Sequence, residues 1–368
     1  MKTKQFLSAS AAAFCAFTIL PVRVHATAIA YNVTVLDALA RDTYSEGINA
    51  SGQVTGSAGS LPGHYAAVWT GTTVTSLDGP GGLPSQGFSI NASGQVAGVV
   101  TGTDLGGYLH AVRWIGTTPT DLGTLGGTNS QARSINDAGQ VVGWSTLTGD
   151  AAVHAVLWNG TAPTDLGTLG GRDSYAWGIN TTGQITGKSD AAGNADIYAV
   201  RWTGTTPTIL STLGGRESDG RSINASGQVA GYSAIAGAGL SFHAVLWTGT
   251  TPTDLGTLGG TNSYGYGINA SGDVIGMSDV SVGSTFAHGF IFTGGTMYDL
   301  NTLLVPGSGV TDVQLSSTGN CINDSGQIAA FGTISGQSAH LLLTPTPEPA
   351  SAVLLLGGAA LLGLRRRR

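Results

Sequence analysis

The sequence predicts an all-β fold, a seven-bladed β-propeller built from repeats of about 44 residues. The first observation is the dipeptide Ile-Asn, closely followed by Gly, which recurs with steps of 42, 45, 44, 44, 45 and 54 residues. The second is the content of each repeat, four short strand-like runs, and the third is a strand-like run that precedes the first repeat. The seven copies are Ile48-Asn49, Ile90-Asn91, Ile135-Asn136, Ile179-Asn180, Ile223-Asn224, Ile268-Asn269 and Ile322-Asn323.

The clearest repeat lies between residues 121 and 171. Asn136 and Gly139 predict a tight turn, because Asn bonds nearby backbone at the first turn position and Gly adopts the left-handed conformation that closes a hairpin. We expect the Gly170-Gly171 pair to turn the chain into the next unit. Four antiparallel strands in one repeat make one blade of a propeller. The predicted strands are residues 130–136, 140–144, 154–158 and 164–168.

The two ends of the array predict a closed ring. The last unit has its Ile322-Asn323 turn and a third strand at residues 340–344, but it has no fourth strand. The chain begins with the missing piece, residues 31–39, which are similar to the fourth-strand segments. An N-terminal strand that completes the last blade removes both open sheet edges. An open solenoid would instead need polar caps at its ends.

The composition excludes several classes of partner. The chain of 368 residues has 59 glycines, which recur at turn positions between β-rich runs and therefore do not indicate disorder. Its formal net charge is −6, and only 10% of its residues are charged. The acidic balance argues against nucleic acid or an anionic membrane surface as a partner.

The N-terminal residues 1–28 have the features of a secretory signal peptide. Lys2 and Lys4 precede an apolar run, and small residues follow with cleavage expected after Ala26 or Ala28. A membrane anchor is the alternative, but the apolar run is short for the ~20 residues that span a bilayer. Cys15 would leave with this peptide, so Cys321 is the one thiol of the mature chain. The other units have Gly or Ser at that position, which predicts a small buried side chain.

The C-terminus predicts a membrane-associated tail after the repeat domain, residues 29–344. Residues 345–349 form a Pro-rich linker, residues 350–364 an apolar transmembrane helix, and residues 365–368 a basic tail. Fifteen apolar residues extend about 22 Å as a helix, short of a hydrocarbon core of about 30 Å, and the arginines make up part of the difference by snorkelling. Arg365, Arg366, Arg367 and Arg368 should remain in the cytoplasm.

This tail resembles the PEP-CTERM sorting signal of Gram-negative bacteria that secrete exopolysaccharide. The matching parts are Pro347, Glu348 and Pro349, the apolar run, and the arginines, in that order. The resemblance implies that an exosortase-type enzyme processes the chain near the motif. The protein would be held in the inner membrane through its C-terminal helix until then, and would afterwards reach the cell surface or the extracellular matrix. An ordinary tail anchor is the alternative.

The repeats resemble a family of bacterial extracellular repeats named for His-Ala-Phe. The matching cores are residues 110–114, 154–158 and 243–247, with weaker matches at residues 65–69, 198–202 and 288–292. The third residue is Val instead of Phe in most copies, and Tyr65 and Tyr198 replace the His. The resemblance covers nearly the whole repeat domain and implies little about function, because the family is defined by its repeats.

The recurring polar residues predict structural roles and no metal or cofactor site. Five histidines share one strand position in different units, and four aspartates share a position in the fourth strands. Residues on separate blades need not meet at a metal, so we expect each to bond a neighbouring segment. These residues are His110, His154, His243, His288 and His340, and Asp121, Asp165, Asp254 and Asp299.

The tryptophans fall into two groups. Trp69, Trp114, Trp158, Trp202 and Trp247 recur on one face of the third strand, which predicts packing between blades. Trp144 and Trp177 do not recur, so they are candidates for an exposed binding surface. Asp190, Asn194 and Asp196 have oxygen ligands at spacings that a calcium loop uses, but the segment lacks the terminal bidentate Glu of such loops.

No catalytic constellation appears in the sequence, and we predict a non-enzymatic surface or matrix protein. The partner would be an exopolysaccharide or a surface protein, bound through the loops between second and third strands, where the units differ most. These loops are residues 101–109, 146–153, 189–197 and 233–242. The alternative is a carbohydrate-active hydrolase or lyase, since one fold hosts both roles. Its acid and base would come from the unrepeated carboxylates Asp150, Asp196, Glu217, Asp219 and Asp279.

Overall fold

The computed structural model describes residues 29–36, 44–59, 64–101, 107–237, 241–283 and 287–346. From Ala30 onward these residues form one compact unit. Its described residues are all-β apart from three short 3₁₀ turns, η1 (Pro80–Gly82), η3 (Thr148–Asp150) and η4 (Leu300–Leu303). Within the described part of the chain, no helix has the length and apolar character to cross a membrane. The predicted signal peptide and the predicted transmembrane helix lie outside the described residues.

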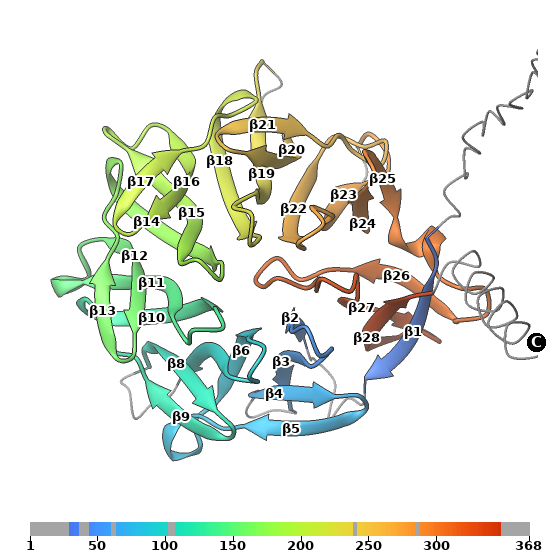
Figure 1. Cartoon of the computed structure of the whole chain (residues 1–368), viewed down its shortest axis with the longest axis horizontal. Helices are drawn as coiled ribbons and strands as arrows, with labels where there is room; N and C mark the ends of the chain where they lie inside the picture. Colours follow the sequence, from blue (N-terminus) through green and yellow to red (C-terminus); the bar gives the residue numbers. More distant parts are fainter. Residues whose placement is uncertain are drawn as a thin grey trace, which may run out of the picture. The chain divides into compact units, whose positions relative to one another are not determined.

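The described strands pair into five four-stranded antiparallel sheets and one eight-stranded sheet. The eight-stranded sheet is two antiparallel sets of four, β14–β17 and β18–β21, which one parallel bridge between Ile197 and Glu217 joins. Figure 1 shows these sets around a common centre; the set that contains β1 has this N-terminal strand at its outer edge. The all-β class and the propeller-like arrangement of four-stranded sets therefore agree with the sequence prediction.

Each set of strands is named here by its innermost strand. The β2 and β6 sets comprise β2 (Tyr44–Ile48), β3 (Val54–Ala58), β4 (Tyr65–Thr70), β5 (Thr73–Leu77), β6 (Ser85–Ile90), β7 (Val96–Thr101), β8 (Leu109–Ile115) and β9 (Thr118–Asp121). The β10 and β14 sets comprise β10 (Gly126–Ile135), β11 (Val141–Leu147), β12 (Val153–Asn159), β13 (Ala162–Asp165), β14 (Gly170–Ile179), β15 (Gln184–Ala191), β16 (Ile197–Thr203) and β17 (Thr206–Ile209).

The remaining sets follow the same plan, apart from the last. The β18 and β22 sets comprise β18 (Gly214–Ile223), β19 (Val229–Ile235), β20 (Phe242–Thr248), β21 (Thr251–Asp254), β22 (Ser263–Ile268), β23 (Val274–Asp279), β24 (Ala287–Thr293) and β25 (Thr296–Asp299). The last set comprises β26 (Val310–Gln314), β27 (Ile328–Ile334), β28 (Gln337–Pro345) and the N-terminal β1 (Tyr31–Leu36).

The pairing of β1 confirms the expected use of the N-terminal strand. β1 runs antiparallel to β28, with Tyr31 opposite Pro345 and Leu36 opposite His340. The strand therefore supplies the fourth position that the last unit lacks in its own sequence. It covers what would otherwise be an open edge of β28.

Two details of the predicted repeat are wrong. The fourth strand of the clearest unit is β13, which ends at Asp165 instead of extending to residue 168. The Asp165 carboxylate accepts a hydrogen bond from the Gly167 amide at 2.7 Å, and this turns the chain early. The Gly170-Gly171 pair is not a turn, because Gly170 begins β14 and lies opposite Ala191.

The turn asparagines connect neighbouring units, which the sequence did not predict. Asn136 Oδ1 accepts bonds from the amides of Ala138 and Gln140, as expected for a turn residue. Asn136 Nδ2 in addition donates to the carbonyl oxygen of Asn180 at 3.1 Å. The same bond between successive turns is made by Asn49, Asn91, Asn180 and Asn224, and Asn323 donates back to the Asn49 carbonyl. These bonds link the last unit to the first.

The core lies between neighbouring sets of strands. The five recurring tryptophans are fully buried, as predicted for packing between blades. Trp114 Nε1 donates to the carbonyl oxygen of Asp78 in the preceding set, and Trp247 Nε1 donates to that of Ser211. A second recurring bond joins the Ala155 amide to the hydroxyl of the buried Ser174 in the next set. Because this interface recurs from unit to unit, the residues that fill it recur in most units.

Candidate functional site

The innermost strands share a β-bulge at one position of the repeat. In the β10 set the pairing register shifts between Ala132 and Ser134, which leaves Arg133 unpaired. A Cβ at Gly143, in the facing strand, would collide with the carbonyl oxygen of Gln131, so this bulge requires glycine there. Bulges redirect a side chain and are common at binding sites. The bulged residues of the six sets from β2 to β22 are Glu46, Phe88, Arg133, Trp177, Arg221 and Tyr266.

These bulged residues are the candidate site that sequence reasoning missed. Each lies two positions before the recurring isoleucine, and the side chain differs in almost every unit. The residues after it are uniform, a small residue followed by Ile-Asn. An aligned set of repeats would have shown this one variable position between fixed ones. Since the backbone around it repeats, packing alone does not require the variation.

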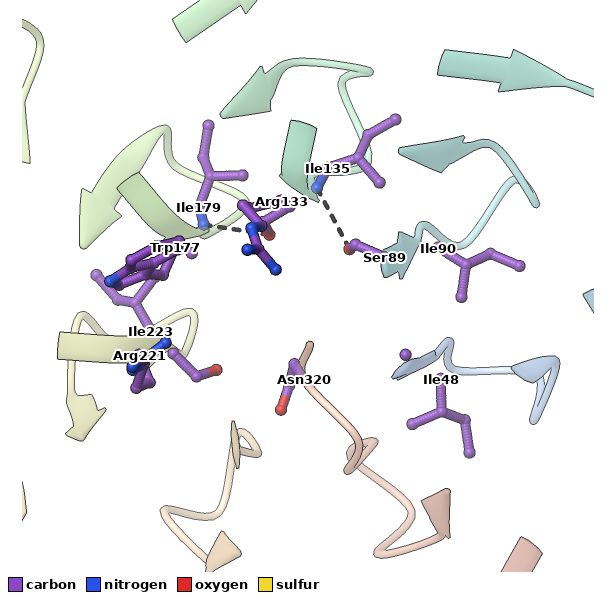
Figure 2. A pocket seen from close by; sticks show the side chains of 14 residues that line it. Ile48, Ser89, Ile90, Arg133, Ile135, Trp177, Ile179, Arg221, Ile223 and Asn320 are labelled. Atoms are coloured by element: carbon purple, nitrogen blue, oxygen red, sulfur yellow. Dashed lines mark hydrogen bonds between the residues drawn. The ribbon is translucent and has the colours of Figure 1, made fainter. Parts of the chain in front are cut away.

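Three of these side chains face a common cavity, the central cavity. Arg133, Trp177 and Arg221 line it from β10, β14 and β18, together with Asn320 of the last unit. Figure 2 shows these four residues around one space, with the recurring isoleucines behind them. The central cavity has a volume of about 120 Å³. A second cavity of about 200 Å³, the outer cavity, shares Asn320 with it and is bordered by the turn asparagines.

Two guanidinium groups flank the indole of Trp177. The guanidinium carbon of Arg133 lies 5.2 Å from the ring centroid, and that of Arg221 lies 5.0 Å from the same centroid. Arg133 also lies over the ring of Phe88 at 4.7 Å. Cation–π contacts at this distance are stabilising, and they hold the two guanidiniums in fixed places at the cavity wall.

Arg221 belongs to a buried ion pair. Its Nη2 lies 3.3 Å from the carboxylate of Asp219, which is fully buried, and 3.3 Å from the hydroxyl of Tyr232. Burial lowers the pKa of Arg221, but Asp219 and Tyr232 outweigh this effect, so its pKa lies above the ordinary value. Burial, together with Asp219, raises the pKa of Tyr232. Arg221 is therefore a buried cation whose charge is balanced by Asp219.

For Arg133 the opposing charge comes from Glu46. Burial lowers the pKa of Arg133 to about 10, and Glu46 acts in the opposite direction. Glu46 is itself buried and accepts a hydrogen bond from the Ser316 hydroxyl. Burial raises the pKa of Glu46 to about 7, although Ser316 and Arg133 both lower it. Near neutral pH the carboxylate that opposes Arg133 is thus only partly ionised.

Several polar atoms around the central cavity have no hydrogen-bond partner among the described residues. They are Arg133 Nε, Trp177 Nε1, Arg221 Nε and Asp219 Oδ1. Three of the four are donors, and they come from the three residues that line the central cavity on one side. Buried donors are nearly always satisfied in folded proteins, so this wall of the cavity is suited to a ligand or water that accepts hydrogen bonds.

The two unrepeated tryptophans, predicted to lie on an exposed surface, are both half-buried. Neither is fully exposed, and both belong to one aromatic group. Trp177 stacks on Tyr175 with centroids 5.4 Å apart, and Trp144 meets Tyr175 edge-on at 6.3 Å. Lys188 lies 5.4 Å from the Tyr175 centroid. A second aromatic group joins the β18 and β22 sets, where Tyr232 meets Tyr264 at 5.1 Å. Aromatic and cationic side chains therefore gather on neighbouring sets of strands.

The recurring histidines and aspartates pair with one another inside each set. His154 Nδ1 lies 2.9 Å from the Asp165 carboxylate, which links the third strand to the fourth. The same pair recurs as His110–Asp121, His243–Asp254 and His288–Asp299. His340 does not share their strand position, contrary to the sequence prediction: Ala339 is the counterpart in β28, and His340 is buried and stacks on Trp69 at 5.6 Å. The predicted structural role, bonding a neighbouring segment, fits these contacts.

The predicted carboxylates of an enzyme occupy separate places. Asp150 accepts bonds from the backbone and side chain of Thr128, and Asp196 pairs with Arg216 at 2.5 Å. Asp279 accepts bonds from Asn262. Glu217 forms part of the bridge that joins β16 to β18. Asp219 is the one member of this set placed near the central cavity, and Glu46 was not among the predicted residues.

The predicted calcium loop uses its oxygens for protein contacts. Asp190 accepts a bond from the Asp173 amide, Asn194 accepts one from the Arg172 amide, and Asp196 pairs with Arg216. No group of three or more metal-ligating side chains gathers within the described residues. Cys321 is buried as predicted, and burial raises the pKa of its thiol.

Other predicted residues lie outside the described part of the chain. They are Ala26 and Ala28 at the expected cleavage sites, Pro347, Glu348 and Pro349 of the sorting motif, and Arg365, Arg366, Arg367 and Arg368. Two of the four variable loops are described only in part, since residues 102–106 and 238–240 are outside the described ranges.

Comparison with known proteins adds little to these observations. No family model matches the sequence, and no match to a curated protein was found. Similar solved structures include a TolB-like protein from Agrobacterium tumefaciens, with 11% identity over 87% of this chain and 100% of that one, at a TM-score of 0.47. TolB from Acinetobacter baumannii has 12% identity over 80% of each chain, at 0.39. An aldose sugar dehydrogenase from Streptomyces coelicolor has 11% identity over 85% of this chain and 98% of that one, at 0.36.

Proposed function

We propose that the chain is an exported, non-enzymatic binding protein built on a seven-bladed β-propeller. Counting the two halves of the eight-stranded sheet as separate blades gives one blade for each Ile-Asn copy. A single bridge between Ile197 and Glu217 is weak pairing beside the seven paired positions that join β15 to β16. The bond from Asn323 to Asn49 and the pairing of β1 with β28 support closure of the ring.

Export and sorting are the second part of the proposal. Residues 1–28 act as a signal peptide, and residues 350–364 form a transmembrane helix that holds the chain in the inner membrane. An exosortase-type enzyme then processes the chain near Pro347, Glu348 and Pro349, and the protein reaches the cell surface or the extracellular matrix. The order of motif, apolar run and arginines in the sequence supports this route. Replacing all three motif residues with alanine should retain full-length protein in the membrane fraction, and equal release of variant and wild type contradicts it.

The observation that carries the binding role is the variable bulge position. The recurring tryptophans, serines and asparagines make the contacts between units, but those contacts do not need Arg133, Trp177 and Arg221 at the cavity wall. These residues combine cations, an aromatic ring and unpartnered donors. Such a wall recognises a polar, negatively charged group. The partner class that fits is an exopolysaccharide, or a surface protein that presents acidic groups.

A carbohydrate-active hydrolase or lyase is the second candidate, and Glu46 is the observation that favours it. Its pKa of about 7 is suitable for a general acid or base. Two contacts argue against this role: the Glu46 carboxylate is engaged by Ser316, and Asp219, the other buried carboxylate nearby, is engaged by Arg221. A glycosidase needs both carboxyl groups free to reach one glycosidic bond.

One experiment separates the two functions. The full-length chain in detergent is incubated with the exopolysaccharide of its own host, and both retention on the polymer and the length of the polymer are measured. The binding proposal predicts retention with no shortening. Shortening that disappears in the Glu46→Gln variant would establish the enzyme instead, and neither retention nor shortening would reject a polysaccharide partner.

A further inference from the structure

The donors of the central cavity lack an acceptor. Arg133 Nε, Trp177 Nε1 and Arg221 Nε belong to three successive innermost strands and have no partner among the described residues. Leaving a buried donor unpaired is unfavourable, and more so for a charged group. Three such donors at one wall are therefore better explained by a group that accepts from all of them than by three independent defects.

The charge of the cavity wall also favours an anion. Arg221 is balanced by Asp219 at 3.3 Å, whereas Arg133 has only Glu46 as an opposing charge nearby. Both guanidiniums are fixed about the same indole, at 5.2 and 5.0 Å. The like charge of Arg221 lowers the pKa of Arg133, and an anion on the cavity side of the two guanidiniums offsets this repulsion.

The rest of the lining is suited to hydroxyl groups. Ser89 contributes a hydroxyl and Asn320 a side-chain amide (Figure 2). Ser134 contributes a second hydroxyl. The hydroxyls of Ser89 and Ser134 accept long bonds from the Ile135 and Ile179 amides, 3.3 and 3.4 Å, and remain available as donors. A ligand with a carboxylate and several hydroxyls can pair both with the cationic donors and with the hydroxyl and amide groups of the lining.

The size of the cavity sets how much ligand enters. A volume of about 120 Å³ is smaller than the ~150 Å³ of a protein cavity that takes up benzene. It therefore admits a carboxylate and part of one sugar ring, with the remainder in the adjoining outer cavity of about 200 Å³. A chain end fits these dimensions, and the middle of a polysaccharide chain does not.

We propose that the central cavity binds the carboxylate of a terminal uronic acid residue through Arg133, Arg221 and Trp177. Arg133 is the principal anchor, because its planar guanidinium offers two parallel donors to a carboxylate. This inference specifies the ligand of the proposed polysaccharide-binding function and rests on it. The Glu46 carboxylate is a built-in competitor for Arg133; it accepts a hydrogen bond from the Ser316 hydroxyl, and the buried thiol of Cys321 donates to the backbone carbonyl oxygen of Glu46.

Calorimetric titration of the full-length chain in detergent tests the proposal. The probes are glucuronate, glucose as the neutral match, and sulfate as an anion without sugar hydroxyls. Glucuronate should bind at least tenfold more tightly than either control. Arg133→Gln should weaken glucuronate binding about 10- to 100-fold, the range expected for losing a charge-assisted bond. Arg113→Gln, the same charge change on β8, should leave it unchanged. Equal binding of glucuronate and sulfate, or equal loss in both variants, overturns the proposal.

A second variant keeps the test decisive if Arg133→Gln does not fold. Glu46→Gln removes the competing charge without adding a contact to the ligand, so it should tighten glucuronate binding several-fold at pH 8. Unchanged affinity at that pH contradicts the assigned role of Arg133. The polymer-retention experiment separates the two levels: retention that Arg133→Gln does not alter rejects the uronate site and leaves the proposed function standing. Glucuronate binding without polymer retention rejects the proposed polysaccharide-binding function and leaves the uronate site standing.

Discussion

Along the third strands, successive units have nearly the same side chains, whereas along the innermost strands one position differs from unit to unit. The third strands place a fully buried tryptophan against the preceding set of strands, and four of them pair a histidine with an aspartate. The innermost strands place Arg133, Trp177 or another residue at a shared bulge. The same repeated backbone therefore imposes uniformity at one place and permits variety at the other.

The difference separates stability from recognition. A contact between two like units has the same shape around the ring, so one residue type fits every interface. Three of the bulged residues, Arg133, Trp177 and Arg221, line the central cavity, and a ligand with different groups needs different partners there. Changes in the third strands should therefore affect folding, and changes at the bulge should mainly affect binding.

The largest expected effect is the loss of a buried interface tryptophan. Trp158→Ala removes a fully buried side chain and should lower the free energy of unfolding by about 3–5 kcal/mol. Trp177→Ala removes the same side chain from the cavity wall and should lower it by no more than about 2 kcal/mol. Urea unfolding followed by circular dichroism measures both. Equal losses in the free energy of unfolding would contradict the proposed difference between the third strands and the bulge position.

The pH dependence of stability should come from the bulge, through Glu46. Burial raises its pKa from 4.5 to about 7, so the folded protein holds this proton more tightly than the unfolded chain does. The resulting stabilisation is fully present below pH 4.5 and is lost as the pH rises to about 7, in all by about 3 kcal/mol. Glu46→Gln should abolish this part of the pH dependence, and Glu217→Gln on β18 should not. Identical pH profiles of wild type and Glu46→Gln would contradict the assignment.

A smaller effect is expected at the turns, which are uniform but lie next to the cavities. Asn136→Ala removes the bond to the Asn180 carbonyl and leaves two turn amides without their side-chain acceptor. We expect a loss of about 1–3 kcal/mol in the free energy of unfolding. Thr181→Ala, an exposed change in the next turn, should alter it by less than about 0.5 kcal/mol. The urea titration used for Trp158→Ala resolves the two.

The recurring positions of the structure could be predicted because the same residue type appears at the same spacing in several units. Asn136, Gly139 and Trp158 were assigned to a turn and to an interface from sequence alone, since each has counterparts at the same spacing. The end of β13 was misplaced because one bond from the Gly167 amide to Asp165 turns the chain, and strand patterns do not record such a bond.

The candidate site could not be predicted in the same way. Arg133, Trp177 and Arg221 are 44 residues apart in sequence, and only the arrangement of the sheets brings them to one cavity. Glu46 was passed over because nothing local marks it. Its burial depends on Ser316, in the irregular segment that makes the last repeat ten residues longer than the typical one. The variable position before each Ile-Asn was nevertheless visible, and it is the signal to look for in such repeats.

The smallest expected effect is at the recurring histidine–aspartate pairs. His154 and Asp165 are 2.9 Å apart, but their side chains are 18% and 40% exposed, and exposed pairs contribute less than about 1 kcal/mol. His154→Gln should therefore lower the free energy of unfolding by less than about 1 kcal/mol and leave glucuronate binding unchanged. His340→Gln provides the contrast one position further along the third strand, because His340 is buried against Trp69 and its loss should be several times larger. If the exposed pair proved as important as the buried stack, recurrence alone, and not burial, would mark the residues that hold the units together.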